Sequence, residues 1–173
     1  MNASLRRATL ADAPAVALIG SATFLETFAG VIRGADVIAH CASAHAVAVY
    51  GSLLTNPEAA VWLAESVDGG APVGYAVLTR PDLPVRDPQP DDLEIKRMYV
   101  LSRFHGSGLG RRLMDAALDE AKYRGARRAL LGVYAHNARA LAFYAKQGFT
   151  RIGERQFQVG ANTYGDYILG RLL

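Results

Sequence analysis

Three glycines stand within five positions, at Gly106, Gly108 and Gly110, between the apolar run "LEIKRMYVL" and the segment "RRLMDAALDEA". Glycine loses more conformational entropy on folding than any other residue. A cluster of this kind is therefore typical of a backbone that needs positive φ or is approached closely. The i, i+4 spacing of apolar residues from Leu109 onward predicts an amphipathic helix over 108–124. The chain thus contains a strand, a loop bare of side chains and a helix in direct succession.

The remaining segments alternate between strand and helix patterns. We expect a strand at "SLRRAT", a helix from its N-cap Asp12 to Phe28, one or two helices over 35–54, and a hairpin formed by "AAVWLAES" and "PVGYAVLTR". A proline-rich loop over 81–92 precedes the strand "LEIKRMYVL". After the glycine loop and its helix we expect the strand "RALLGVY", the helix "NARALAFYAKQ" and two closing strands. This order predicts one α/β domain over 1–173, with a mixed sheet and helices on both faces.

The glycine loop is compatible with few anion-binding motifs. A P-loop needs Lys and then Ser or Thr after its last glycine, whereas Arg111 follows Gly110 here. The dinucleotide fingerprint Gly-x-Gly-x-x-Gly, counted from Gly106, places Arg111 at its last position. A strand, a bare loop and a helix N-terminus still form a good phosphate site. The alternative is a tight turn that needs glycine only for its φ angles.

Three segments together resemble the GNAT (Gcn5-related) N-acetyltransferases. "HGSGLG" is similar to the acyl-CoA pyrophosphate loop of that family, and "LEIKRMYV" and "NARALAFYAKQGF" are similar to its flanking segments in order and spacing. More loosely, "TFLETFAG" and the C-terminal "FQVGANTYGDYILGRLL" are similar to PaiA-type polyamine acetyltransferases. The resemblance implies a twisted, mixed but mostly antiparallel sheet of about six to seven strands, and acetyl-CoA as co-substrate.

The resemblance also implies where acetyl-CoA binds. Backbone groups of Met98 and Val100 are expected to pair with the pantetheine arm, and splaying of their strand from "RALLGVY" would admit it. His105 stands where the family has Gln or Arg, which puts its side-chain contribution in doubt. The full set of expected contacts is Met98, Tyr99, Val100, His105, Gly106, Ser107, Gly108, Leu109, Gly110, Arg111, Asn137 and Tyr144.

Acetyl transfer to an amine needs a base, because an alkylamine is mostly protonated at neutral pH, and an acid for the departing thiolate. Glu94 matches the position of a strand glutamate that serves as the base in histone-type members. Strict alternation would place Glu94 on one face with Met98 and Val100 unless a bulge intervenes. The alternative is a solvated charge paired with Lys96. Tyr144 is the expected acid, although beside Phe143 it is equally compatible with core packing.

Composition and the remaining motifs limit the other functions. The net charge of +3 is too small to indicate nucleic acid, but it suits an anionic small molecule. Cys41 is the single cysteine, and the histidines lack metal-ligand spacing, so we expect no metal site. The N-terminus resembles neither a secretory signal nor a membrane span, so we expect a cytoplasmic protein without membrane contact. The family resemblance allows a homodimer.

The expected function is transfer of acetyl from acetyl-CoA to a primary amine of a small molecule in a ternary complex. Alternatives are a non-catalytic acyl-CoA sensor, an acetyltransferase acting on a protein amino group, and a phosphate-binding module of another class. The PaiA-like ends favour a polyamine. The acids available to hold a polycation are Glu26, Asp36, Asp87, Asp91, Asp92 and Asp166.

Overall fold

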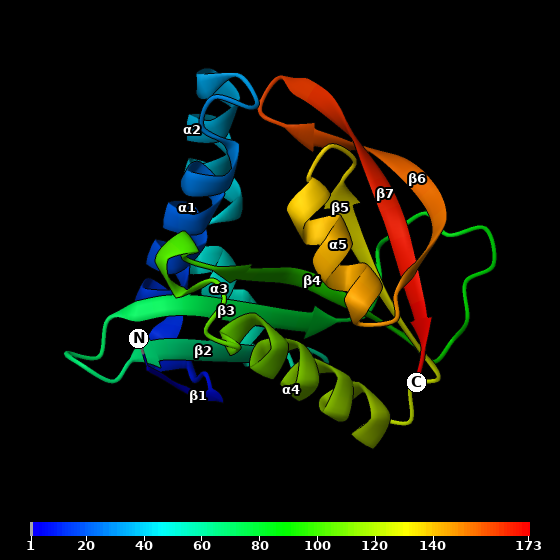
Figure 1. Cartoon of the computed structure of the whole chain (residues 1–173), viewed down its shortest axis with the longest axis horizontal. Helices are drawn as coiled ribbons and strands as arrows, with labels where there is room; N and C mark the ends of the chain where they lie inside the picture. The colour runs from blue at the N-terminus through cyan, green and yellow to red at the C-terminus, as the bar shows by residue number, and fades with distance from the viewer. Residues whose placement is uncertain (1) are drawn as a thin grey trace.

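The computed structural model describes residues 2–173, and its frame is one seven-stranded sheet in the order β1-β2-β3-β4-β5-β7-β6 (Figure 1). Neighbouring strands are antiparallel except β4 and β5, which are parallel. The strands are β1 (Ala3–Arg7), β2 (Ala60–Ser66), β3 (Pro72–Thr79), β4 (Asp92–Val100), β5 (Arg128–Tyr134), β6 (Thr150–Val159) and β7 (Asn162–Leu172). The mixed, mostly antiparallel sheet predicted from the sequence is confirmed.

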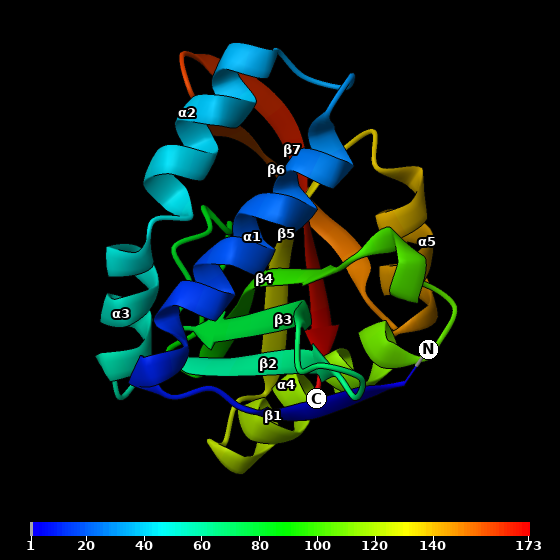
Figure 2. The same cartoon turned by 90° about the vertical axis from the view of Figure 1, so that its left-hand side faces the viewer.

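Helices cover both faces of this sheet (Figures 1 and 2). The α-helices are α1 (Ala13–Phe28), α2 (Gly34–Ala44), α3 (Val47–Thr55), α4 (Leu109–Tyr123) and α5 (Ala138–Lys146), and the short 3-10 turns are η1 (Leu10–Asp12) and η2 (Ser102–Phe104). The alanine-rich stretch expected over 35–54 is two helices. Gly125, with φ +79°, follows the end of α4 as its C′ residue.

Two apolar layers enclose the sheet. One cluster joins α4 and α5 to one face and includes Leu113, Leu131 and Tyr144; the other joins α1 and α3 to the opposite face and includes Tyr50 and Val77. Strands β2 and β3 lie between these layers and are buried along nearly their whole length. A strand covered on both faces has no solvent side, which explains why their sequences are continuous apolar runs.

The sheet opens between β4 and β5. These two strands pair only at their beginnings, where Asp92, Leu93 and Glu94 lie opposite Arg128, Ala129 and Leu130. From Ile95 onward β4 pairs with β3 alone, and Figure 1 shows the two strands diverging. The splay expected from the sequence is therefore present. It leaves one edge of β4 without a strand partner in the middle of the sheet.

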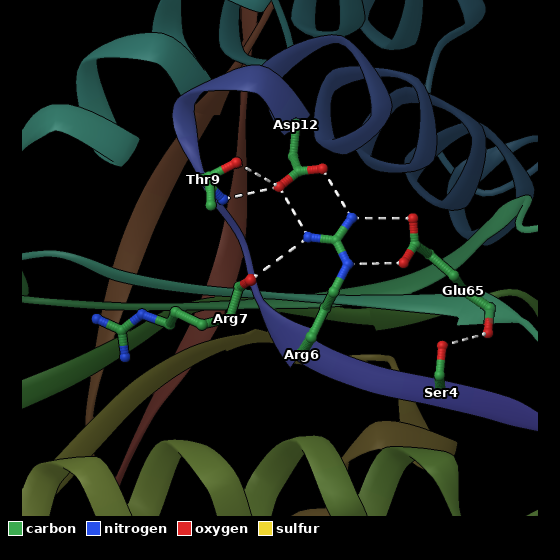
Figure 3. Close-up of polar contacts among 6 residues, drawn as sticks. All are labelled: Ser4, Arg6, Arg7, Thr9, Asp12 and Glu65. Carbon is green, nitrogen blue, oxygen red and sulfur yellow. Dashed lines mark hydrogen bonds and ion pairs between the residues drawn. The ribbon is translucent and has the colours of Figure 1, made fainter.

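The guanidinium of Arg6 links the N-terminal strand to neighbouring segments of the chain, as Figure 3 shows. Arg6 donates to both oxygens of Asp12 at 2.9 and 2.8 Å and to both oxygens of Glu65 at 2.8 and 3.0 Å. Asp12 also accepts from the Thr9 N–H at 2.7 Å, so it stabilises the turn before α1 and is not a side-chain cap of α1 itself. Arg6 thus joins β1, η1 and β2.

Helix α2 is tied to the β6–β7 hairpin, which lies beside it in both views (Figures 1 and 2). The carboxylate of Asp36 accepts from the Ala161 N–H at 3.0 Å, from Asn162 Nδ2 at 2.8 Å and from the Tyr164 hydroxyl at 2.7 Å. Gly160, with φ +59°, packs so closely that a Cβ there would lie 2.5 Å from an Asp36 oxygen. This contact joins α2 to the tip of the β6–β7 hairpin, on the side of the sheet opening.

Over residues 2–173, no single helix is both long and apolar enough to cross a membrane. Only α2 and α3 taken together reach the required length and hydropathy, and they are bent by 43°.

Candidate active site

A cleft of about 960 Å³ follows the opening between β4 and β5. Strand β4 contributes Glu94 through Val100 to its wall, so the cleft meets both faces of this strand. The glycine loop and α5 line the part on the α4 side, while α1, α2 and the β6–β7 hairpin line the part on the α1 side. The sheet opening thus joins two half-sites, which we call the loop half and the hairpin half.

The glycine loop begins the loop half. Gly106 and Gly108 have φ of +80° and +83°, and Gly108 is the residue that precedes α4. A Cβ at either position would meet no atom within 4 Å, so both glycines are needed for backbone conformation, and no neighbouring protein atom requires their small size. Gly110 differs, because its φ is not positive and a Cβ there would lie 3.6 Å from the Phe143 ring.

Backbone N–H groups of this loop are available to a ligand. Among residues 2–173 no acceptor bonds the N–H of Gly106, Gly108, Gly110 or Arg111. The first turn of a helix leaves such donors free, and its dipole favours an anion there. Ser107 instead turns its hydroxyl inward, donating to the Phe104 carbonyl at 2.7 Å. The tight-turn alternative therefore accounts for two glycines, whereas the free N–H groups also make the loop an anion site.

The end of β4 presents its backbone to the sheet opening. The Leu101 N–H donates to the Val73 carbonyl, so the polar groups of the preceding Val100 point away from β3 and toward β5. The Val100 carbonyl is hydrogen-bonded to His105, whose Nε2 lies 2.7 Å from its oxygen. The Val100 N–H remains directed into the opening. His105, the departure from the family pattern, thus ties the glycine loop to β4.

Helix α5 supplies Asn137 and Tyr144 to the loop half. The Asn137 side chain accepts from the Ala140 N–H at 3.1 Å, which makes it the N-cap of α5. Tyr144 is 9% exposed and packs beside Phe143 and Phe149. Burial raises the pKa of Tyr144 to about 12, so its hydroxyl keeps its proton throughout the physiological range. Tyr144 therefore belongs to the core and also lines the cleft.

The side-chain roles of three expected contacts differ from one another. Leu109 is 2% exposed and belongs to the core, so only its backbone faces the loop. Tyr99 stacks on Tyr75 with ring centroids 6.0 Å apart, on the α1 side of β4, whereas Met98 packs on the α4 side. The side chain of Tyr99 therefore lies on the face opposite the glycine loop.

A bulge in β4 changes which side chains share a face. Arg97 lies opposite Val77 and Ile95 lies opposite Leu78, so Lys96 is the extra residue. A bulge of the kind allowed for in the sequence analysis is thus present, and strict alternation does not group Glu94 with Met98 and Val100. Glu94 instead lies on the α1 side of the sheet with Arg97, and it faces the hairpin half of the cleft.

Glu94 is not the solvated charge of the alternative interpretation. It is 2% exposed, and its Oε2 accepts from the Asp82 N–H at 2.9 Å. Burial raises the pKa of Glu94 to about 7; the Asp82 N–H bond and the charge of Lys96 oppose that rise. Lys96 pairs with the Asp82 carboxylate, not with Glu94. A carboxyl group in the cleft therefore changes protonation near neutral pH, which suits a general base.

Most acids expected to hold a polycation have partners within the protein. Asp36 binds the hairpin, Glu26 accepts from the N–H and hydroxyl of Ser102 at 2.8 and 2.7 Å, and Asp166 pairs with Arg155 at 3.1 Å. Asp91 pairs with Arg127 and Asp92 with Arg128, both outside the cleft. Asp87 is exposed on the proline-rich loop and does not line the cleft.

One cluster in the cleft was not predicted from the sequence. It consists of Gly132, Arg155 and Asp166. Arg155 forms its buried pair with Asp166 directly over Gly132, where a Cβ would lie 2.6 Å from the guanidinium. Gly132 is the one glycine of "RALLGVY", and its place in a strand was the available signal. The sequence could not show that Arg155 packs on Gly132, because only the fold brings β5 and β6 together.

Two histidines without metal-ligand spacing in the sequence lie side by side in the cleft. His40 and His45 have ring centroids 5.4 Å apart. Across residues 2–173, however, no group of three or more His, Cys, Asp or Glu side chains is placed to hold a metal ion.

Comparisons with known proteins agree with this geometry. Residues 22–149 match the model of the Acetyltransferase (GNAT) family. An uncharacterized N-acetyltransferase of Mycobacterium tuberculosis is 33% identical over 164 residues, covering 95% of this chain and 99% of the relative. The structure of PaiA N-acetyltransferase from Thermoplasma acidophilum in complex with coenzyme A matches with TM-score 0.79 at 16% identity, covering all of both chains. Ribosomal-protein-alanine N-acetyltransferase from Brucella melitensis matches with TM-score 0.73 at 25% identity, over 98% of this chain and 99% of that one.

Proposed function

Because the chain belongs to the GNAT family of acetyltransferases, which use acetyl-CoA, we propose that it acetylates the primary amine of a small molecule by direct attack in a ternary complex. The observation that carries the proposal is the position of Glu94. It is a buried carboxyl group with a pKa near 7, at the sheet opening and across β4 from the glycine loop.

The proposed reaction uses the two half-sites together. Acetyl-CoA enters from the loop half, with its pyrophosphate at the free N–H groups of the glycine loop and its thioester near Val100. The amine enters from the hairpin half and gives its proton to Glu94. The amine nitrogen then bonds to the thioester carbon, whose oxygen accepts from the Val100 N–H, and the carbon–sulfur bond breaks. Tyr144 donates its proton to the departing thiolate, and the second proton that the acetylated nitrogen loses restores the Tyr144 hydroxyl.

The test measures release of the CoA thiol from acetyl-CoA with polyamines, amino acids and aminoglycosides as acceptors. We expect turnover with at least one class of amine, and we expect ATP and NAD to compete poorly with acetyl-CoA. CoA binding without turnover of any amine or peptide would instead favour the non-catalytic sensor.

A protein amino group is the second candidate acceptor. The likeness to the ribosomal-protein-alanine acetyltransferase supports it, since that match spans nearly the whole of both chains. Short peptides with a free N-terminus, included in the same assay, distinguish this candidate. Peptides acetylated with a higher kcat/KM than any free small amine would favour it.

A further inference from the structure

Arg97 is a cation of the hairpin half with no carboxylate partner among residues 2–173. It follows the bulge of β4, and its guanidinium carbon lies 5.1 Å from the centre of the Tyr50 ring. The side chain lines the cleft, yet its Nη1 is buried and has no hydrogen-bond partner among residues 2–173. A buried guanidinium nitrogen without an acceptor is costly, and such atoms are few in native structures.

The other charged groups around the cleft do not compensate Arg97. Lys96 pairs with Asp82, and Arg155 pairs with Asp166. In the described part of the chain, no carboxylate lies within 4 Å of the Arg97 guanidinium. Among residues 2–173, Arg97 is thus a cation of the hairpin half that no carboxylate contacts directly, and its charge opposes a polycation.

The groups that surround Arg97 are neutral. His45 contacts the Tyr50 hydroxyl through Nδ1 at 2.8 Å, and its Nε2 is also buried without a partner among residues 2–173. Burial, and then the charge of Arg97, lowers the pKa of His45 to about 3, so this ring does not add a second charge at neutral pH. Phe24 and His40 stack on each other with ring centroids 4.3 Å apart, and both rings lie beside His45. Arg97 therefore faces a largely aromatic part of the cleft, and an ion pair beside such apolar groups is stronger than in water.

Arg97 lies close to the proposed base. Their partners on β3 are Val77 for Arg97 and Thr79 for Glu94. These partners are two residues apart on one face, a distance of about 7 Å along a strand. A molecule the size of an amino acid can therefore present its amine near Glu94 while its anionic end reaches the long side chain of Arg97.

We propose that the acceptor amine also carries a carboxylate, and that the guanidinium of Arg97, which has no carboxylate partner among residues 2–173, binds it. This inference rests on the proposed function, because it names the acceptor class for the same site. A planar guanidinium fits a carboxylate with two parallel hydrogen bonds, which fixes the orientation of the bound molecule. Arg97 is thus a specificity residue of the hairpin half. The acceptor class is an amino acid, not a polyamine.

The test compares acceptors that differ only in this group. L-phenylalanine, L-methionine and L-alanine are assayed against their primary amides and against spermidine, with thiol release from acetyl-CoA as the readout. The amine of an amide is the less basic of each pair, so amine reactivity alone favours the amide. We expect at least one amino acid to exceed its amide in kcat/KM by about tenfold or more, because a site built for a polar group rejects the analogue that lacks it. Amides or spermidine that equal or exceed every amino acid overturn the proposal.

Variants of Arg97 assign the preference to this residue. Arg97→Gln is expected to reduce the ratio of kcat/KM between amino acid and amide to within about threefold, and Arg97→Lys to retain part of it. Arg86→Gln is the matched control, since it removes an equal charge from an exposed position that does not line the cleft. Thermal unfolding checks that each variant is folded. An unchanged ratio in folded Arg97→Gln contradicts the assignment.

A binding measurement separates this inference from the proposed function. Calorimetry of the same amino acids and amides with the protein–CoA complex requires no turnover. If no amine is acetylated, the proposed function fails. Even then, tighter binding of amino acids than amides, lost in Arg97→Gln, supports the carboxylate site. Equal binding of both series overturns it.

Discussion

At the scale of single residues, the site depends on environments that change ordinary side-chain chemistry. Glu94 and Tyr144 are both buried, and burial raises the pKa of each by disfavouring its charged form. The consequences differ. Glu94 comes to titrate near neutral pH, where it can accept a proton, whereas Tyr144 keeps its proton. One physical cause therefore suits the two side chains to the proposed roles, Glu94 as base and Tyr144 as acid.

Glu94→Gln is expected to lower kcat by about 100-fold or more, which is typical of the loss of a general base. In the wild type, kcat/KM should rise with pH through about 7, because Glu94 must be deprotonated to act. The variant should lack this inflection. A pH–rate profile measures it, with Asp119→Asn on the exposed face of α4 as control. A wild-type profile retained in the variant excludes Glu94 as the base.

Glu94 should also affect stability with a defined sign. Its pKa is about 7 in the folded protein and 4.5 for the free group, so between these values the folded state binds more protons than the unfolded state. The free energy of unfolding should therefore fall as pH rises through this window. Denaturant titrations at several pH values check this. If Glu94 ionises with its ordinary pKa, the free energy of unfolding will depend on pH equally in the wild type and in Glu94→Gln, and the prediction is wrong.

Tyr144→Phe is expected to lower kcat by about tenfold to 100-fold while the KM for acetyl-CoA changes little. The phenyl ring retains the packing against Phe143 and Phe149, and only the hydroxyl is removed. Steady-state kinetics with both substrates measure the effect. Equal kcat in variant and wild type means that Tyr144 is a core residue only.

At the scale of elements, the glycine loop was predictable because its signal is local. A left-handed φ before a helix is a requirement of the adjacent backbone, and glycine in the sequence reports it directly. The bulge in β4 was not predictable in position. A one-residue register shift arises from pairing with β3, which is distant in the chain, and it decides the face of Glu94.

Gly108→Ala should raise the KM for acetyl-CoA several-fold. Gly125→Ala is the matched control, because both glycines have positive φ, +83° and +79°, and at neither would an added Cβ lie within 4 Å of another atom. Each substitution should cost about 1 kcal/mol of stability through backbone strain. Only the first alters the loop that we propose to bind acetyl-CoA. Equal KM values in the two variants would show that the loop is merely a tight turn.

At the scale of the whole molecule, the hairpin half exists because distant segments are held together. Helix α2 and the β6–β7 hairpin meet through Asp36, more than 120 positions from its partners in the chain. Three donors to this carboxylate, the Tyr164 hydroxyl foremost, hold the pKa of Asp36 below its ordinary value. Its contribution to stability is thus present above the ordinary pKa and is lost as pH falls through the folded value.

Asp36→Asn should lower the midpoint of thermal unfolding at neutral pH and raise the KM for the acceptor more than that for acetyl-CoA. The reason is that the tether shapes the hairpin half alone. Asp87→Asn, on the exposed proline-rich loop, is the control. Differential scanning calorimetry and two-substrate kinetics provide the readouts. A uniform rise in both KM values would mean that the tether supports the entire fold and not one half-site.

The sequence by itself determined the order of elements, the mixed sheet, the glycine loop and the family, because periodicity, glycine placement and short motifs are properties of neighbouring residues. Only the tertiary structure decided that Lys96 has a partner and that Arg97 has none among residues 2–173, that Glu94 is buried on the α1 side, and that the acids expected to hold a polycation are largely occupied. Burial and pairing depend on which distant segments meet, and no local pattern contains that information.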